Sequence, residues 1–533
     1  MKKCLTLLLS AALAAGLLSG CAKENTTCEG MPTPPPSVVV NCGLSNPWDS
    51  LMPYNSPSGS NYSRIIYDKI YDRLAYVHAD GTLSPRAAVS WESADGGMAV
   101  VFHLDRKAAF HDGTPVTARH WADTIALMTD PDCPTLGRSA FAVLAGTDGD
   151  GNARRGHALG AEAVDDYTLK LTFKAPTTPE DFLLDRNREY YVLPTHLLEG
   201  VAPEDVMAQE LWYRPIGSGP CKFSYEVAGS QLVLEANKDY QLGAPGFDKL
   251  SITVMDKSNL LTALIAGDLD YYAFGGSVSA EDSKAAQAAG LTVIKGTVPT
   301  TFFELMLNGQ SIPDARVRRA IEAALDKELL CEQSAPGLAV PTDTSVLPGS
   351  PSYPYGADAA ARPRDLEGAK ALLSEAGYAG TTYKLACTSN RAGLAALIQQ
   401  NLNEAGISTA IETVDSATLF SGMVDGTYDM AIASHTPSAL PLWFVDSRFT
   451  RNNNIFHVGD LSGYESEIAA VKEEADPAAR RALVAALDAH LMEERPFIPL
   501  WFSTALHVQS PTVEGIDYAS SSFSNENVWA WKK

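Results

Sequence analysis

The stretch 394-LAALIQQNLNEAGISTAIETV-414 carries the pattern that decides the fold class. Residues 394–405 have apolar side chains at the spacing of a buried helix face, and Gly406 follows as the stop. Residues 407–414 then alternate apolar and polar side chains, as a half-buried strand does. Because helices and strands continue to alternate around this stretch, the sequence predicts α/β lobes with largely parallel sheets.

The same design extends on both sides of this stretch. Asp314 and Asp365 precede two further amphipathic segments, 314–327 and 365–376, and Asp476-Pro477 is a strong helix start. Apolar strands are expected at 428–434 and 497–502, and another helix at 260–266. The earlier half of the chain contains more strands, at 38–40, 99–104, 168–173, 231–235 and 249–255, with helices at 62–74 and 117–128. This half fits a mixed α/β layer.

Length and charge limit the classes of protein to which the chain can belong. The 533 residues exceed what one core usually holds, so two or three domains are expected. The formal net charge is −23, and such an acidic surface repels nucleic acid and anionic lipid headgroups. Partners of those two kinds are therefore not expected.

The first residues read as an export signal. Lys2 and Lys3 precede an apolar run over residues 5–18, which is too short to span a bilayer as a helix. The run ends in Leu-Ser-Gly-Cys at residues 18–21, which is typical of a lipobox, so we expect cleavage after residue 20 and lipidation of Cys21. An ordinary secretory signal is the alternative. Residues 21–37 contain four prolines and few apolar side chains, and they predict a flexible tether.

No cysteine spacing or short motif points to a metal, a cofactor or catalysis. Cys28 and Cys42 are expected either to bridge in an oxidising compartment or to remain free thiols. His111-Asp112-Gly113 is interpreted as a structural turn, and no nucleophile or zinc motif is present. We therefore expect no enzyme activity, no cofactor and no metal site.

Six blocks in a fixed order resemble one known family. They are 67-YDKIYDRLAYVHADGTLSPRAAVSW-91, 110-FHDGTPVTA-118, 215-PIGSGP-220 followed by residues 237–240, 317-VRRAI-321 with Asp326-Lys327, 369-AKALLSEAGY-378 and 428-YDMA-431. Together they resemble the family 5 solute-binding proteins of peptide, nickel and opine importers. The resemblance covers almost the whole chain after residue 37.

The resemblance implies a two-lobed periplasmic-binding-protein-like fold with mixed sheets, an extra domain in the first lobe and a ligand cleft between the lobes. The first lobe is expected at residues 38–266 and 500–533, with an extra subdomain at about 56–195. The second lobe is expected at residues 267–499.

Loops at strand ends supply the candidate ligand-binding side chains. Tyr54 and Asn55 follow the first strand, and Phe302 begins a strand of the second lobe, where ligand and core are equal alternatives. Arg391 follows a strand and is expected to bind a carboxylate, or merely to cover the surface.

The loop 434-SHTPSALPLWFVDSRF-449 is the most informative site. In peptide-binding relatives this loop carries an Asp that pairs with the peptide's amino terminus. Here the first acid is Asp446, so either Asp446 takes that role or the ligand lacks such a cation. Trp443 and Phe444 are expected as apolar walls, or as packing beneath the loop, and His435 as a hydrogen-bond donor to ligand.

The resemblance implies a monomeric, lipid-anchored extracytoplasmic receptor that captures an oligopeptide, dipeptide or peptide-like solute. It would deliver this solute to an ABC permease and its ATPase. The alternatives are a non-peptide solute, namely a nickel chelate, an opine or a sugar, and a sensory lipoprotein with the same fold.

Overall fold

The computed structural model describes residues 37–533, except 56–60, 79, 187–189, 274–277, 357–360, 447, 450–453, 475 and 519–526. The expected signal peptide, the tether up to residue 36, Cys21 and Cys28 lie outside the described residues. Val38–Lys533 form one compact unit. Among the residues described, no helix combines the length and the apolar character that a membrane crossing requires.

Most of the first lobe is organised around a seven-stranded mixed sheet. β1 pairs in parallel with β10 and β11, whereas β8, β9, β12 and β19 join antiparallel. Helix α1 (Asn61–Ile70) packs in one large apolar cluster with this sheet, and helices α4 (Lys257–Ala266) and α5 (Ala280–Ala288) form another. The strand order is β12 (Thr292–Lys295), β19 (Leu506–Gln509), β11 (Tyr271–Tyr272), β1 (Val39–Leu44), β10 (Lys249–Val254), β9 (Gln231–Ala236) and β8 (Cys221–Val227).

A smaller antiparallel sheet completes the first lobe. It has the order β4 (Ala88–Ala94), β5 (Ala99–Leu104), β7 (Thr168–Thr172) and β6 (Ala161–Asp165). Helices α2 (Ala118–Thr129) and α3 (Pro179–Arg186) accompany it, and β2 (Ala75–Val77) pairs with β3 (Leu83–Pro85) in a hairpin. All these elements fall within the range 56–195 that was expected for an extra subdomain.

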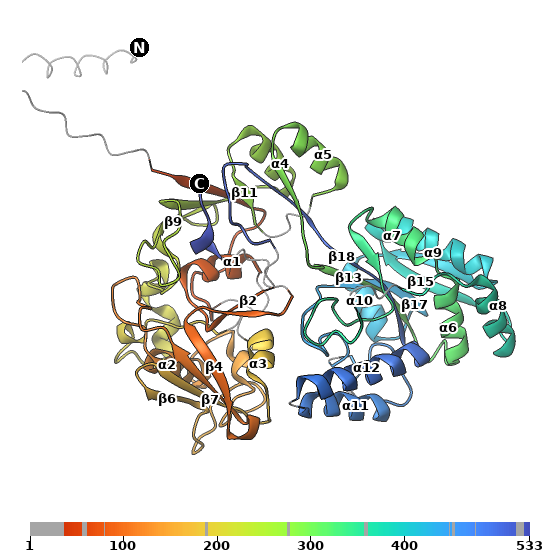
Figure 1. Ribbon diagram of the computed structural model, residues 1–533, viewed down its shortest axis with the longest axis horizontal. Helices are drawn as coiled ribbons and strands as arrows, with labels where there is room; N and C mark the ends of the chain where they lie inside the picture. The colour runs from red at the N-terminus through yellow and green to blue at the C-terminus, as the bar shows by residue number, and fades with distance from the viewer. Residues whose placement is uncertain are drawn as a thin grey trace, which may run out of the picture. The chain divides into compact units, whose positions relative to one another are not determined.

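The second lobe surrounds a six-stranded mixed sheet. Its order is β14 (Ala339–Pro341), β18 (Phe497–Ser503), β13 (Thr301–Leu307), β17 (Met430–His435), β15 (Thr382–Thr388) and β16 (Ser408–Val414). One apolar cluster holds α6 (Ala315–Ala324), α7 (Lys327–Ser334), α8 (Leu366–Glu375) and α9 (Ala392–Glu404), and Figure 1 shows these helices gathered at β15. A second cluster holds α10 (Ser416–Val424), α11 (Ser462–Glu473) and α12 (Pro477–Glu494).

Local sequence accounts for where the helices of this lobe begin and end. The side chains of Asp314, Asp365 and Asp476 accept hydrogen bonds from backbone N–H groups in the first turns of α6, α8 and α12. Gly377 and Gly406 follow α8 and α9 with φ of 64° and 89°, a backbone region that favours glycine. The predicted α/β class with mixed sheets is confirmed. The expectation of largely parallel sheets was wrong, because most neighbouring strands of both large sheets pair antiparallel.

Two expected lobe boundaries differ from the sheet pairing. The stretch after residue 266 was expected in the second lobe, yet β11 and β12 pair within the seven-stranded sheet. The return was expected at residue 500, yet β18 continues in the six-stranded sheet to Ser503. The physical reason lies at Gly267, which ends α4 with φ of 84°. The chain turns there and stays in the first lobe. The chain passes from one sheet to the other between Lys295 and Thr301, and returns between Ser503 and Leu506.

The blocks 110-FHDG-113 and 215-PIGSGP-220 pack against each other through His111. Its Nδ1 accepts a hydrogen bond from the Gly217 N–H, and its Nε2–H donates to the Gly219 carbonyl, both at 3.1 Å. The Gly219 N–H in turn donates to the carbonyl of Ile70 at 2.8 Å. Because both ring nitrogens bond to backbone, the interpretation of this motif as structural agrees with the geometry.

A substitution at Gly217 tests this packing directly. A Cβ atom there would lie 1.9 Å from the Ile70 carbonyl oxygen, so Gly217→Ala must displace backbone. We expect a loss of about 3 kcal/mol or more in the free energy of unfolding, measured by denaturant titration. Gly393→Ala is the matched control, because a Cβ atom at Gly393 meets nothing within 4 Å. Equal stability of the two variants would contradict this account.

His111 makes the first lobe sensitive to acid. Burial lowers the pKa of His111 from 6.5 to about 4, and a proton on Nδ1 would face the Gly217 N–H. A lowered histidine pKa contributes stability above pH 6.5 that is lost as pH falls toward 4. Wild type should lose about 2 kcal/mol more than His111→Gln between pH 7 and pH 5. Urea unfolding at the two pH values measures this difference, and parallel losses would refute it.

Candidate functional site

The candidate site lies at the end of the six-stranded sheet from which the chain crosses to the first lobe. β13 begins there at Thr301, and β18 ends there at Ser503. β17 runs antiparallel to β13, which places His435 opposite Phe302. β15 is parallel to β17, so the residues after Thr388 emerge at the same edge. Carboxyl ends of strands are where α/β sheets usually bind ligands.

An aromatic cluster covers one face of the sheet at this end. Ring centroids of Phe302 and Phe444 are 5.1 Å apart, and those of Phe302 and Trp443 are 5.7 Å apart. The rings of His435 and Phe444 are separated by 5.5 Å. Phe302 and Phe444 are buried, whereas Trp443 is half-buried and its Nε1–H donates to the Ser345 carbonyl at 2.9 Å. In this structure Phe302 and Phe444 pack beneath the loop, and Trp443 has the larger exposed surface.

Glu304, His435 and Arg448 form a hydrogen-bonded chain under the same loop, which we call the polar relay. Glu304 is fully buried on β13, and its Oε1 accepts a hydrogen bond from His435 Nε2–H at 2.8 Å. Arg448 Nη2 donates to Nδ1 of His435 at 3.2 Å, and its Nη1 donates to the Phe444 carbonyl. Both nitrogens of His435 are therefore used within the protein.

Arg391 is a half-buried cation at this edge. Its guanidinium donates to the Ile432 carbonyl at 2.9 Å and to Ser434 Oγ, and lies 5.3 Å from the centroid of the Phe303 ring. Burial lowers the pKa of Arg391. Within the described part of the chain, no carboxylate forms an ion pair with it.

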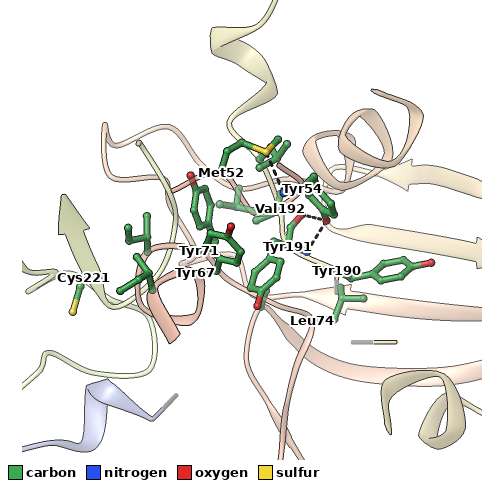
Figure 2. Packing of buried hydrophobic residues seen from close by; sticks show 14 of the residues in the cluster. Met52, Tyr54, Tyr67, Tyr71, Leu74, Tyr190, Tyr191, Val192 and Cys221 are labelled. Carbon is green, nitrogen blue, oxygen red and sulfur yellow. Dashed lines mark hydrogen bonds between the residues drawn. The ribbon is translucent and has the colours of Figure 1, made fainter. Parts of the chain in front are cut away.

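Three expected residues have other surroundings. The Tyr54 hydroxyl donates to the Tyr191 carbonyl and accepts from the Tyr191 N–H, both at 2.8 Å, and Figure 2 shows Tyr54 in the core of the first lobe. The Asn55 N–H closes a turn on the Met52 carbonyl. Asp446 forms a salt bridge of 2.5 Å with Lys472 on α11. The structure thus brings Phe302, Arg391, His435, Trp443 and Phe444 together at one edge, whereas Tyr54 and Asn55 lie in the first lobe and Asp446 is paired with Lys472.

Sequence reasoning missed Glu304, Arg448 and Ser434. Glu304 left a readable signal, because it is the one charge in the otherwise apolar strand 301-TFFELML-307. Arg448 left none, since only the folded loop returns it to His435, which is 13 residues earlier in the chain.

A separate cavity of about 540 Å³ opens at the opposite end of the second lobe. Gly309 follows the carboxyl end of β13 and Pro496 precedes β18, so this cavity lies away from the crossings. Tyr464 and His490 stack beside it with ring centroids 4.5 Å apart. It does not belong to the candidate site. Across the described ranges, no three His, Cys, Asp or Glu side chains are grouped to hold a metal ion.

The polar relay predicts a coupled effect on stability. Glu304→Leu leaves Arg448 without its opposing charge, so we expect a loss of ~2–4 kcal/mol in unfolding free energy. Glu304→Leu combined with Arg448→Met should cost less than the sum of the single variants. Asp446→Asn is the control, since its pair with Lys472 is about half exposed and should contribute under about 1 kcal/mol. Additive losses in a chemical denaturation cycle would argue against the relay.

Comparisons with known proteins agree with this architecture. Residues 82–456 match the model of the bacterial extracellular solute-binding proteins, family 5 Middle. The oligopeptide-binding protein AppA of Bacillus subtilis is 25% identical over 427 residues, which cover 76% of this chain and 73% of AppA.

Two solved structures have similar folds. The ABC transporter substrate-binding protein CtaP of Listeria monocytogenes aligns with a TM-score of 0.77 at 19% identity, covering 93% of this chain and 99% of CtaP. The unliganded open form of MppA, a periplasmic murein tripeptide-binding protein, aligns with a TM-score of 0.77 at 21% identity, covering 93% and 97%. The chain therefore belongs to family 5 of the bacterial extracellular solute-binding proteins.

Proposed function

We propose that this chain is the substrate-binding lipoprotein of an ABC importer, which captures an oligopeptide, dipeptide or peptide-like solute between its lobes. The observation that carries the proposal is the placement of five candidate side chains at the sheet end beside both chain crossings. Relatives with oligopeptide-binding names support the solute class. The bound solute would pass unchanged to a membrane permease and its ATPase.

The two crossings supply the mechanism of capture. They are short, and they hydrogen-bond to each other between the Gly296 N–H and the Ala505 carbonyl at 2.8 Å. A small change in the dihedral angles of these residues rotates one lobe against the other. Solute bound at the second-lobe edge would gain contacts from the first lobe on closure, so binding energy selects the closed form.

The charges at the site favour a ligand with an anionic group. Glu304 is opposed by Arg448 through His435, and Asp446 is paired with Lys472. Arg391 forms no ion pair with a carboxylate among the described residues and no carboxylate acts on it through a bridging side chain there, so we assign it to a carboxylate of the ligand. A ligand ammonium would find no comparable partner in this loop.

The other assignments follow the same proposal. Trp443 would form an apolar wall, with Phe302 and Phe444 packed behind it, and His435 would contact ligand through its ring edge. Tyr54, Asn55 and Asp446 remain predictions. We also propose that Cys21 is lipidated and that the chain is a monomer held at the outer face of a membrane. A second candidate ligand, favoured by Arg391, is a non-peptide acid of the opine type.

The identity of the ligand can be measured on purified protein. Native mass spectrometry followed by denaturation should release an intact small solute that carries a carboxylate. Calorimetry with tripeptide to pentapeptide mixtures should then show binding of free acids, and binding weaker by ~10-fold or more for C-terminal amides. Arg391→Gln should remove this preference, while the exposed-site variant Arg119→Ala should retain it.

Three outcomes would count against the proposal. Equal affinity for acids and amides, unchanged by Arg391→Gln, would exclude the assigned role of Arg391. A hydrolysed solute would contradict simple capture. Absence of binding to peptides, together with a co-purified sugar or metal chelate, would exclude the peptide class.

A further inference from the structure

A direct ion pair joins the two lobes away from the crossings. Arg480, in the first turn of α12, donates through Nη1 to Oδ2 of Asp181 in the first turn of α3. The two residues are 299 positions apart in the chain. Figure 1 labels both helices, with α3 in the first lobe and α12 in the second. Only 14% of the Arg480 side chain and 18% of the Asp181 side chain are exposed.

Each partner is held in place by its own lobe. Asp181 Oδ2 accepts a hydrogen bond from Thr178 Oγ1 at 2.8 Å, and the Asp181 N–H donates back to that hydroxyl at 3.1 Å. Arg480 Nε donates to the Val471 carbonyl on α11 at 3.1 Å. Because both side chains are oriented before they meet, the ion pair requires little further ordering of either one.

Apolar contacts surround the pair. Leu184, which lies one turn beyond Asp181 on α3, packs against the second-lobe cluster that contains Ala439 and Leu487. The turn between β2 and β3 approaches so closely that a Cβ atom at Gly81 would lie 2.6 Å from Cβ of Ala439. This packing limits water around the ion pair, and limited water strengthens its Coulomb attraction.

We propose that Asp181 and Arg480 form a latch that holds the two lobes in contact independently of ligand. The inference rests on the proposed function insofar as the closed arrangement is the one that holds solute. The latch lies outside the Arg391 edge, so it sets the ratio of closed to open molecules without contacting the solute. Apparent affinity scales with the fraction of molecules in the competent state.

Small-angle X-ray scattering of the ligand-free full chain tests the latch. Protein stripped of solute by reversible denaturation should be compact in 50 mM salt, and Arg480→Ala and Asp181→Ala should each have a larger radius of gyration. We expect the fitted ratio of closed to open molecules to fall about fivefold or more in these variants. Arg119→Ala, which removes an exposed pair with Asp123 inside α2, is the matched control and should match wild type.

Two further measurements keep the latch testable if a single variant folds poorly. The charge exchange Asp181→Arg with Arg480→Asp should restore the compact form. Raising salt from 50 to 500 mM should expand wild type less than either alanine substitution does, because salt screens a largely buried pair only weakly, and it should not expand the alanine variants. Unchanged scattering in folded Arg480→Ala, or a folded charge exchange that stays expanded, would overturn the latch. The scattering test uses no ligand, so its outcome does not depend on whether the chain binds peptides. A failed latch likewise leaves the peptide assignment unaffected.

Discussion

Two short chain segments join the sheets of the two lobes, and the backbone hydrogen bonds between them are the constraint on which the other features depend. The Gly296 N–H bonds to the Ala505 carbonyl at 2.8 Å, and the Thr300 N–H bonds to the Ser503 carbonyl at 2.9 Å. These bonds combine the two crossings into one narrow ribbon, so the lobes share a single place at which to bend. They also determine which end of the six-stranded sheet faces the first lobe. Arg391, His435 and Trp443 are candidate ligand-binding residues because they lie at that end.

The sheet edge at Arg391 and the contact between Asp181 and Arg480 differ in how their charges are paired. At the sheet edge, Glu304 and Arg448 oppose each other through His435, and Arg391 forms no ion pair with a carboxylate of the described residues. At the far contact, Asp181 and Arg480 neutralise each other across the gap between lobes. A ligand-binding group must keep hydrogen-bonding capacity for its ligand. In a latch, by contrast, the two partners must neutralise each other's charge when the lobes meet. The structure separates these two requirements in space.

Local patterns predicted several regular elements of the second lobe, but they missed α10, α11 and β14. α8, α9 and α12 carry their own start and stop signals in Asp365, Gly406 and Asp476-Pro477, because capping depends on residues a few positions apart. α7 was not predicted, since it is short and follows α6 after two residues. The expected boundary at residue 267 differs from the sheet pairing for a related reason. A glycine that ends a helix looks the same in sequence whether the chain then leaves the lobe or turns back into the sheet.

From sequence alone, the α/β class and the family could be predicted, because periodicity, caps and blocks that resemble a family are properties of neighbouring positions. Five candidate binding residues named from the sequence lie at one edge and stay predictions. Tertiary structure decided everything that depends on partners far apart in the chain. It put Tyr54 in the core against Tyr191, paired Asp446 with Lys472, and brought Glu304 within 2.8 Å of His435. Burial and ion pairing are set by which strands and helices become neighbours, and linear spacing carries no record of contacts between residues of different elements.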